Sequence, residues 1–328
     1  MGNPIYGDIH VDTPLTNMSV AYMQDQTAFV ADKIFPIVPV KKQSDLYFIY
    51  SRADFLRNEA AIRAYGAESK GGGYNISNAP YFANIYAFHK DVYPTDRTNS
   101  DDPLQPDADA TEFVSQKLVL KREVDFQLRF FATGLWGTEY SGAAAADTVT
   151  KKKKYWSSSG SIPMEDIGNA QVGMQAVTGK KANTLLLGPY TYLALRDNDE
   201  VRDLIRYTQG AAIPTPNMLA QMFDVERVLV GSAVVNDAAS GAAEDTDFIL
   251  GKHALLCYTE NAPGIKKISA GYIFSWTGLE GAGAFGNRIY RLPMDNLGVG
   301  TIRIEGEMAY DIELIATDLG VFFKDIVE

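Results

Sequence analysis

The chain contains 328 residues, a length that allows about two domains with a substantial buried core. Hydrophobic residues make up 46% of it and charged residues 22%, ordinary globular values that exclude intrinsic disorder and collagen-like repeats. The 30 Lys and Arg and the 41 Asp and Glu give a net charge of −11, which disfavours sequence-specific nucleic-acid binding. Cys257 is the single cysteine, so an intrachain disulfide and an all-cysteine zinc site are excluded.

The sequence carries no recognisable membrane or targeting signal. No stretch approaches the roughly 18 uninterrupted apolar residues of a membrane helix. The first residues lack the basic and apolar regions of a signal peptide. We therefore expect a soluble protein made in the cytoplasm, with no membrane partner.

Residues 1–44 are predicted to form an extended N-terminal arm. They are rich in turn-forming residues, and Pro36 and Pro39 cannot donate backbone hydrogen bonds to a full strand ladder. Aromatic and β-branched residues then predict strands at 46–51 and 81–92.

The segment between these two strands is far longer than the roughly 2–5 residues of an ordinary hairpin loop. It interleaves charged residues with few large apolar ones and then contains three glycines at 71–73. Such a segment cannot bury a core of its own. It is either a disordered surface loop or a long arm that is ordered by lying across a neighbouring subunit.

The strongest helical pattern in the sequence covers about 109–136. Pro103 and Pro106 stop the segment before it, and Asp109 with Glu112 resembles a capping box. A helix of this length would extend on the order of 40 Å. The apolar residues expected near one face are Val114, Leu118, Val124, Leu128, Phe131 and Leu135.

The rest of the chain predicts helices followed by many strands. Residues 138–162 are small and polar, and the lysine run at 151–154 is expected to be a solvated loop rather than a patch that binds phosphate or a partner. Helices are predicted at 163–179, 189–198, 199–208 and 216–223, and strands at 183–188, 226–235, 247–259, 270–277, 287–293 and within 300–326. This order indicates an α+β fold rather than a doubly wound parallel sheet.

Two motifs offer weak candidates for enzymatic chemistry. The string GAGAFG at 281–286 matches a dinucleotide-binding pattern, but a strand rather than a helix is predicted after it, so we interpret it as a flexible loop. His253 and Cys257 lie four residues apart on a predicted strand. That spacing separates them by roughly 13 Å, too far for proton transfer, and favours buried packing residues.

Metal-binding patterns are equally weak. His10, His89 and His253 lie in widely separated segments, and metal ligands usually cluster in sequence. The acidic pairs at 101–102 and 197/199 lack the glycine and terminal glutamate of a calcium loop, and are interpreted as turn and cap residues. We therefore predict no catalytic residue, no metal site, no cofactor and no enzymatic activity.

Six stretches of sequence occur in a specific order. They are LTNMSVAYMQDQTAFVADKIFPIVPVKKQSDLYFIY, TEFVSQKLVLKREVDFQLRFF, NTLLLGPYTYLALRD with IRYTQG, MFDVERVLVGSAVVN, GKHALLCYTENAPG with GYIFSW, and AYDIELIATDLGVFFKD. Taken together, they resemble the major capsid proteins of tailed bacteriophages. The resemblance covers nearly the whole chain.

The resemblance implies an α+β fold of the tailed-phage capsid type, divided into five parts. These are an N-terminal arm at 1–44, an extended β-hairpin loop at 45–90, a peripheral domain at 91–185 with a spine helix at about 109–136, an axial domain at 186–295, and a C-terminal return to the peripheral domain at 296–328.

The implied function is structural. Copies of the chain would self-assemble into hexamers and pentamers of an icosahedral phage head, the virion capsid, which encloses double-stranded DNA without sequence-specific binding. Assembly would take place in the host bacterial cytoplasm. Because the arm begins almost at Met1, a separate scaffolding protein is expected, together with a portal and, in some relatives, a decoration protein.

The predicted inter-subunit contacts lie in the extended loop. Some relatives cross-link their shells through a lysine in this loop, but no motif identifies a partner for Lys70, which we interpret as a solvated or ion-pairing residue. The residues expected to contact a neighbouring copy are Arg52, Arg57, Glu59, Arg63, Tyr65 and Lys70.

Two other functions remain open at this stage. The same fold could form an encapsulin-like compartment that encloses a cargo enzyme. Alternatively, the chain could be a soluble hydrolase or transferase, which would remain a monomer or small oligomer under all assembly conditions.

Overall fold

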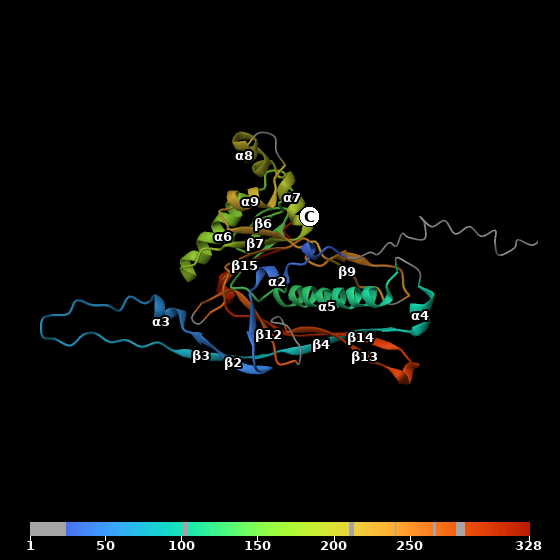
Figure 1. Cartoon of the computed structure of the whole chain (residues 1–328). Helices are drawn as coiled ribbons and strands as arrows, with labels where there is room; N and C mark the ends of the chain where they lie inside the picture. The colour runs from blue at the N-terminus through green and yellow to red at the C-terminus, as the bar shows by residue number, and fades with distance from the viewer. Residues whose placement is uncertain (1–23, 101–103, 210–212, 240, 265–266, 280–285) are drawn as a thin grey trace, which may run out of the picture.

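Two β-sheets, one above the other, organise the chain (Figure 1). The computed structural model describes residues 24–100, 104–209, 213–239, 241–264, 267–279 and 286–328. One long helix lies between the sheets, and shorter helices surround the upper sheet (Figure 1). This mixture of helices with mixed sheets confirms the predicted α+β class.

The lower sheet has five strands built around β14 (Ile302–Leu314). This strand pairs antiparallel with β4 (Asn84–Val92), β13 (Asn287–Pro293) and β12 (Gly271–Trp276). β1 (Ile37–Val40) adds to β12 in parallel. Every second side chain of β14 from Ile304 to Ile312 is buried, the period of a strand with one face in the core.

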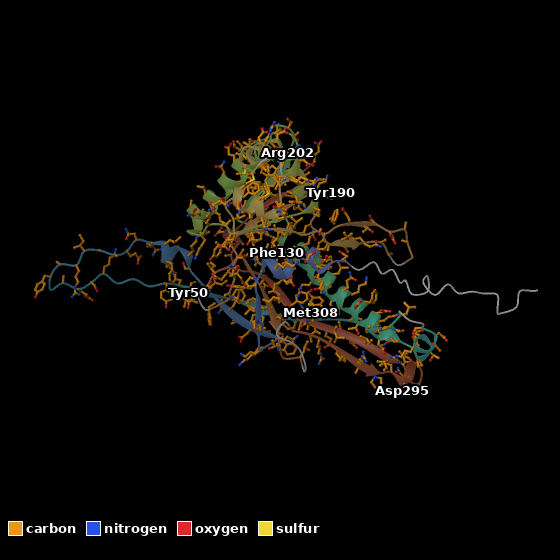
Figure 2. The ribbon with its side chains drawn as sticks, turned by 45° about the horizontal axis from the view of Figure 1, so that its top comes forward. Tyr50, Phe130, Tyr190, Arg202, Asp295 and Met308 are labelled. Carbon is orange, nitrogen blue, oxygen red and sulfur yellow. The ribbon has the colours of Figure 1, made fainter. Side chains whose placement is uncertain are left out.

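Helix α5 (Pro106–Phe130) packs on that buried face. Val114 and Leu118 contact the sheet at Gly306, where a Cβ atom would lie 2.6 Å from the Val114 side chain. The close approach of helix and strand therefore requires glycine at this position. Figure 2 shows Phe130 and Met308, two members of the core between α5 and the lower sheet.

The observed bounds of α5 differ from the prediction of 109–136. The helix starts at Pro106, because proline suits the first helical turn. It ends at Phe130, because the chain turns back so that the Trp136 indole N–H donates to the Phe130 carbonyl at 2.8 Å. The Trp136 ring packs against Gly320 and is buried.

The buried face of α5 also differs from the predicted one. Val114 and Leu118 are buried as expected, whereas Leu128 is 64% exposed. The core face continues instead through Glu123 and Phe126. An assignment based on apolar residues alone misplaces this face, because one of its members is a glutamate.

The upper sheet has six strands in the order β6 (Lys152–Lys154), β5 (Thr138–Ala143), β15 (Gly320–Lys324), β11 (Ala254–Cys257), β7 (Thr184–Leu187) and β8 (Arg227–Val230). β7 and β11 are buried along their whole length, which explains their continuous apolar sequence. The surrounding helices are α6 (Pro163–Thr178), α7 (Pro189–Asp197), α8 (Asp199–Gln209) and α9 (Pro216–Met222).

Short elements complete the described chain. The predicted strands at 226–235 and 247–259 are each interrupted, so that β9 and β10 form a separate two-stranded ribbon. The remaining elements are η1 (Gln26–Ala28), α2 (Ala31–Ile34), β2 (Ser44–Tyr50), α3 (Arg52–Leu56), β3 (Ile76–Phe82), α4 (Pro94–Asn99), β9 (Val234–Asn236), β10 (Thr246–Phe248), η2 (Asp295–Leu297) and η3 (Thr317–Leu319).

Sheet membership does not follow the expected ranges of 186–295 and 296–328. β12 and β13 fall within the first range but belong to the lower sheet, because they pair with β14. β15 falls within the second range and lies inside the upper sheet, between β5 and β11. The C-terminal residues therefore contribute to both sheets.

Candidate assembly surfaces

β2 and β3 form an antiparallel hairpin that projects from the lower sheet (Figure 1). One face is anchored: the Tyr47 and Tyr81 rings stack on Phe274 of β12, with centroid distances of 5.4 and 4.6 Å. The opposite face carries large apolar side chains that are 50–69% exposed: Leu46, Phe48, Ile76 and Phe82. Because a two-stranded hairpin is only marginally stable in water, this apolar face is a candidate contact surface.

Beyond its strands the hairpin continues through α3 and the segment 57–75. The Asp54 carboxylate links the two sides, accepting hydrogen bonds from the Asn75 backbone N–H and side-chain amide at 2.9 and 3.0 Å. The backbone hydrogen bond from Asn75 is the main cause that holds the pKa of Asp54 below its usual value. The Tyr50, Phe55 and Tyr74 rings also contact one another. These contacts order the stem of a loop that has no buried core.

Arg52 and Arg57, two of the predicted contact residues, have ion-pair partners within their own chain. Arg52 pairs with Asp318, which follows the lower sheet, and thereby ties the stem of the hairpin to the body. Arg57 pairs with Asp54 at 3.4 Å and with Glu59, another predicted contact residue, at 3.1 Å. The sequence pattern did not reveal Asp318 as a partner, because 266 residues separate it from Arg52.

The other three predicted contact residues lie at the tip of the hairpin. Tyr65 is 108% exposed and the neighbouring Ile62 is 103% exposed, so both side chains are as accessible as in an isolated peptide. Arg63 donates a hydrogen bond to the Ala67 carbonyl, and Lys70 is exposed. The structure brings all six predicted residues onto one projecting hairpin.

A buried carboxylate joins the segment before β1 to the long helix. Glu123 of α5 is 1% exposed and accepts hydrogen bonds from the backbone N–H groups of Val30 and Ala31 at 3.0 and 2.9 Å. Burial raises the pKa of Glu123, while these hydrogen bonds and the charge of Arg122 oppose the shift. Arg122 in turn pairs with Asp32 of α2 at 2.9 Å. The start of α2 is therefore fixed on α5.

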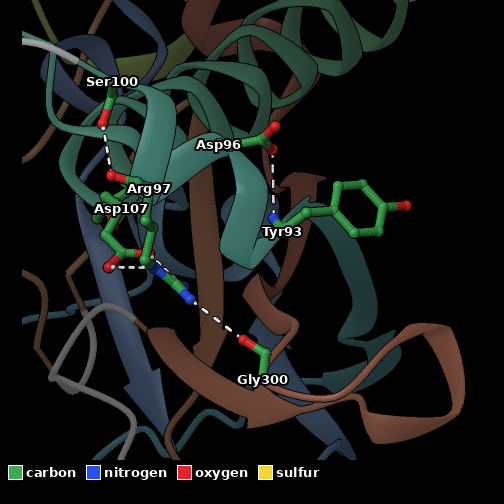
Figure 3. Close-up of polar contacts among 7 residues, drawn as sticks. Tyr93, Asp96, Arg97, Ser100, Asp107 and Gly300 are labelled. Carbon is green, nitrogen blue, oxygen red and sulfur yellow. Dashed lines mark hydrogen bonds and ion pairs between the residues drawn. The ribbon is translucent and has the colours of Figure 1, made fainter.

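Arg97 of α4 links neighbouring elements at the end of the lower sheet that lies opposite the hairpin. Figure 3 shows its guanidinium between Asp107 of α5, at 2.8 Å, and the Gly300 carbonyl of the β13–β14 turn, at 3.2 Å. The hydrogen bond with Arg97 is the main cause that holds the pKa of Asp107 below its usual value. One side chain thus fixes three elements relative to one another.

A cavity of about 620 Å³ opens next to this cluster, between β4, α4 and the first turns of α5. Its apolar lining residues are Val92, Leu104, Pro106, Ala110 and Phe113. Its charged lining residues are Lys90, Asp91, Asp96 and Asp109. It therefore combines an apolar surface with a mainly acidic one.

The lysine run is not the solvated loop that we expected. Lys152–Lys154 forms β6 at the edge of the upper sheet, and the Lys153 ammonium pairs with the buried Asp166 carboxylate at 2.8 Å. The same ammonium lies 5.0 Å from the centre of the Tyr140 ring. Asp166 also accepts a hydrogen bond from the Trp156 indole. The buried Asp166 carboxylate pairs with one lysine of the run, a contact that amino-acid composition cannot predict.

Replacing Lys153 by alanine should lower the free energy of unfolding by about 1–3 kcal/mol, because the buried Asp166 loses its cation. Urea denaturation of the purified protein would measure this change. Lys152 is exposed and adjacent in sequence, so Lys152→Ala is the matched control, expected to stay within about 0.5 kcal/mol of the unmodified protein. Equal changes in the free energy of unfolding for Lys153→Ala and Lys152→Ala would contradict the assignment of Lys153 as the partner of Asp166.

His253 directly precedes β11, and Cys257 is the last residue of that strand. Cys257 is fully buried, and burial raises the pKa of its thiol to about 12. The His253 ring accepts a hydrogen bond from the Asp325 backbone N–H at 3.0 Å. Cys257 belongs to the apolar core, and the His253 ring packs against Phe131 and Phe322.

The Cys257 thiol should therefore be unreactive in the folded protein. We expect no labelling by a maleimide at pH 8 in the native protein and complete labelling after denaturation, both measured by mass spectrometry. Rapid labelling of the native protein would show that β11 is accessible.

Several sequence motifs lie outside the described residues. These are residues 1–23 of the predicted arm, including His10, then Asp101 and Asp102, and residues 281–285 of the glycine-rich string. Among the residues that the structure describes, no three His, Cys, Asp or Glu side chains are grouped so as to hold a metal ion. Within the same ranges, no helix has the length and apolar character needed to cross a membrane.

No family model matches the chain. Two curated relatives are each named "Major capsid protein". The relative from Burkholderia phage BcepMu is 22% identical over 230 residues, covering 69% of this chain and 70% of its own length. The relative from Pseudomonas phage JBD67 is 26% identical over 324 residues, covering 97% of both chains.

Solved structures resemble the chain over most of its length. A phage-related protein from Bordetella bronchiseptica has a TM-score of 0.69 at 18% identity, over 92% of this chain and 93% of its own. The capsid of the cyanophage P-SCSP1u has a TM-score of 0.61 at 10% identity, over 94% and 90%. The chain has the tailed-phage capsid fold.

This capsid fold also occurs outside phages. An encapsulin from Synechococcus elongatus matches with a TM-score of 0.55 at 11% identity, over 96% of this chain and 94% of its own. The fold alone therefore does not distinguish the subunit of a phage head from that of a cargo compartment. The curated relatives favour the phage head, and they confirm the resemblance to phage major capsid proteins that the sequence predicted.

Proposed function

We propose that the protein is the major capsid protein of a tailed phage, whose copies assemble into the hexamers and pentamers of an icosahedral head. The observation that carries this proposal is the projecting hairpin, whose apolar outer face has no cover in the described chain although the fold is that of a capsid subunit. A neighbouring copy would bury that face. The role that we propose for the protein is structural, since the curated relatives are capsid proteins rather than enzymes.

The shell would enclose double-stranded DNA by confinement, because a net charge of −11 disfavours a tight grip on phosphate. We further propose assembly in the host bacterial cytoplasm, with a separate scaffolding protein, a portal and, where present, a decoration protein. We propose that the five parts of the chain, from the N-terminal arm to the C-terminal return, have separate roles in the shell. The C-terminal part nevertheless contributes strands to both sheets.

The hairpin residues would divide between two roles. Arg57, Glu59, Arg63, Tyr65 and Lys70 are proposed to contact a neighbouring copy, since they lie on the loop beyond the stem. Arg52 is already paired with Asp318 of its own chain, so its proposed contribution is to hold the hairpin in the direction of the neighbour.

Electron microscopy and sedimentation of the expressed chain, with the head proteins encoded beside its gene, would test the proposal. We expect closed shells of uniform diameter built from this chain. Subunits that remain monomeric with the complete set of head proteins would refute the assignment.

An encapsulin-like compartment is the second candidate, favoured by the structural match to the Synechococcus elongatus encapsulin. The same preparation distinguishes the two functions. A phage head would incorporate a portal at one vertex, whereas a compartment would copurify with an enzyme in its interior.

A further inference from the structure

We propose that His253 is an acid-sensitive switch, whose protonation releases the turn at Asp325 that joins β15 to residues 326–328. The neutral ring holds this turn through one hydrogen bond, and the protonated ring cannot keep that bond. The switch would act within a single copy of the chain. It therefore goes beyond the proposed function, and its test on the purified chain can succeed or fail independently of shell assembly.

The His253 ring lies in a largely apolar environment between the upper sheet and the end of the long helix. Its side chain is 18% exposed. The rings of Phe131, which directly follows α5, and of Phe322 in β15 lie 6.0 and 5.5 Å from it, measured between ring centres. A positive charge is poorly solvated in this position, so burial is the main cause that lowers the pKa of His253. The ring is therefore neutral near pH 7 and gains its charge only in more acidic solution.

The hydrogen bond to Asp325 requires the neutral form of the ring. Nδ1 of His253 accepts the backbone N–H of Asp325 at 3.0 Å, and only an unprotonated nitrogen has the lone pair to do so. When the ring gains its second proton, Nδ1 becomes a donor, and two N–H groups then face each other. The Asp325 carboxylate lies 3.6 Å from Nδ1 and can accept the new N–H after a short movement. Protonation thus exchanges one partner on Asp325 for another.

The backbone at Asp325 favours such a movement. This residue has a φ of +44°, in the left-handed region that residues other than glycine uncommonly adopt. A backbone in this region costs free energy and persists where neighbouring contacts hold it. The hydrogen bond from the Asp325 N–H to His253 is one of these contacts. Once that bond is lost, the turn can relax toward an ordinary conformation.

The residues beyond the turn join the upper sheet to the segment that follows β6. The Ile326 N–H donates to the Lys252 carbonyl at 3.1 Å, and the Ile326 carbonyl accepts the Trp156 N–H at 2.9 Å. The Ile326 side chain is fully buried in the same core as Trp156. A movement at Asp325 would therefore loosen residues 326–328 from the segment around Trp156.

Two charged groups, both at the end of β15, act on the ring. The Asp325 carboxylate raises the pKa of His253 and the Lys324 ammonium lowers it, each by less than burial does. The two phenylalanine rings beside His253 do not titrate, and α7 contributes the Thr191 hydroxyl, which donates to the His253 carbonyl at 3.1 Å. Because the pKa of the folded state lies below the ordinary value of about 6.5, the neutral ring stabilises the turn fully above that value. This stabilisation is lost as the pH falls through the lowered pKa.

Amide hydrogen exchange of the purified protein, followed by mass spectrometry at pH 7.5 and pH 5.0 in one fixed state of assembly, would test the switch. After correction for the intrinsic pH dependence of exchange, we expect residues 325–328 to exchange about tenfold faster at the lower pH. The buried strand β7 in the same sheet is the internal control, and its corrected rate should not change. Equal corrected rates for residues 325–328 at both pH values would overturn the proposal.

Replacing the histidine would identify the titrating group. His253→Asn keeps a neutral acceptor close to the position of Nδ1 but cannot become charged, so it should remove the acid-induced increase in exchange. His89→Asn makes the same substitution at an exposed histidine of β4 and should keep the full increase. An increase of normal size in folded His253→Asn would overturn the proposal.

Asp325→Asn provides a second test, which keeps His253 and therefore does not depend on the folding of His253→Asn. The substitution removes the negative charge that raises the pKa of His253, and asparagine also tolerates the left-handed region. The midpoint of the acid-induced increase should therefore move to lower pH. Asp224→Asn changes another aspartate with a positive φ and should leave the midpoint unchanged. A midpoint that stays in place or rises in Asp325→Asn would overturn the assignment of His253 as the switch.

Discussion

Glu123→Ala is expected to lower the free energy of unfolding by about 3–5 kcal/mol, among the largest effects of any single substitution in this chain. The substitution leaves the N–H groups of Val30 and Ala31 without an acceptor in a buried position. It also removes a negative charge beside the buried Arg122. Urea denaturation of the unassembled subunit would measure the loss.

Two further variants make this test specific. Glu112→Ala removes an exposed carboxylate from the same helix and should change the free energy of unfolding by no more than about 0.5 kcal/mol. Glu123→Gln keeps an oxygen that can accept the two N–H groups, so its loss should be smaller than that of Glu123→Ala. Equal losses for the two Glu123 variants would mean that charge, not hydrogen bonding, fixes α2.

Shortening the hairpin should abolish shell formation while the subunit remains folded. The Ser51 N–H donates to the Asn75 carbonyl at 3.0 Å, so a two-residue Asn-Gly turn can replace residues 52–74 and leave β2 and β3 paired. Because the removed segment buries no core, we expect the free energy of unfolding to change by about 1 kcal/mol or less. Shells should fall below detection in sedimentation and electron microscopy.

A second replacement separates the chemistry of the loop from its length. A Gly and Ser sequence of equal length in place of 57–74 preserves the reach of the loop but removes its charged and apolar side chains. It should also fail to assemble. Shells at the normal yield from either variant would contradict the proposed role of the hairpin, and an unfolded product would show that the loop belongs to the core.

Elements with a strong local signal were predictable from the sequence. The pattern at 163–179 corresponds to α6, and the apolar run at 183–188 contains the buried strand β7. The long loop between β2 and β3 was predictable because a segment with few large apolar residues cannot bury a core of its own. Its stem is ordered within the subunit by the Asp54 and Asn75 hydrogen bonds, a detail that composition does not contain.

Features that depend on distant partners were not predictable. Glu123 and Lys153 look like solvated charges in sequence, because their significance comes from the N–H groups of Val30 and Ala31 and from the Asp166 carboxylate. The end of α5 was misplaced for a related reason. Trp136 continues an apolar helical pattern, but its ring packs against Gly320, whose position in the upper sheet only the complete fold determines.

The position of β14 constrains when the subunit can fold. This strand holds β4, β13 and β12 together, and its pairs with β4 join residues as far apart in sequence as Asn84 and Tyr310. β15, still nearer the C-terminus, lies inside the other sheet. Folding with such non-local pairing is slow, and neither sheet can close before the last part of the chain has left the ribosome. The hairpin and the cavity therefore acquire their final places only after β14 and β15 have been synthesised.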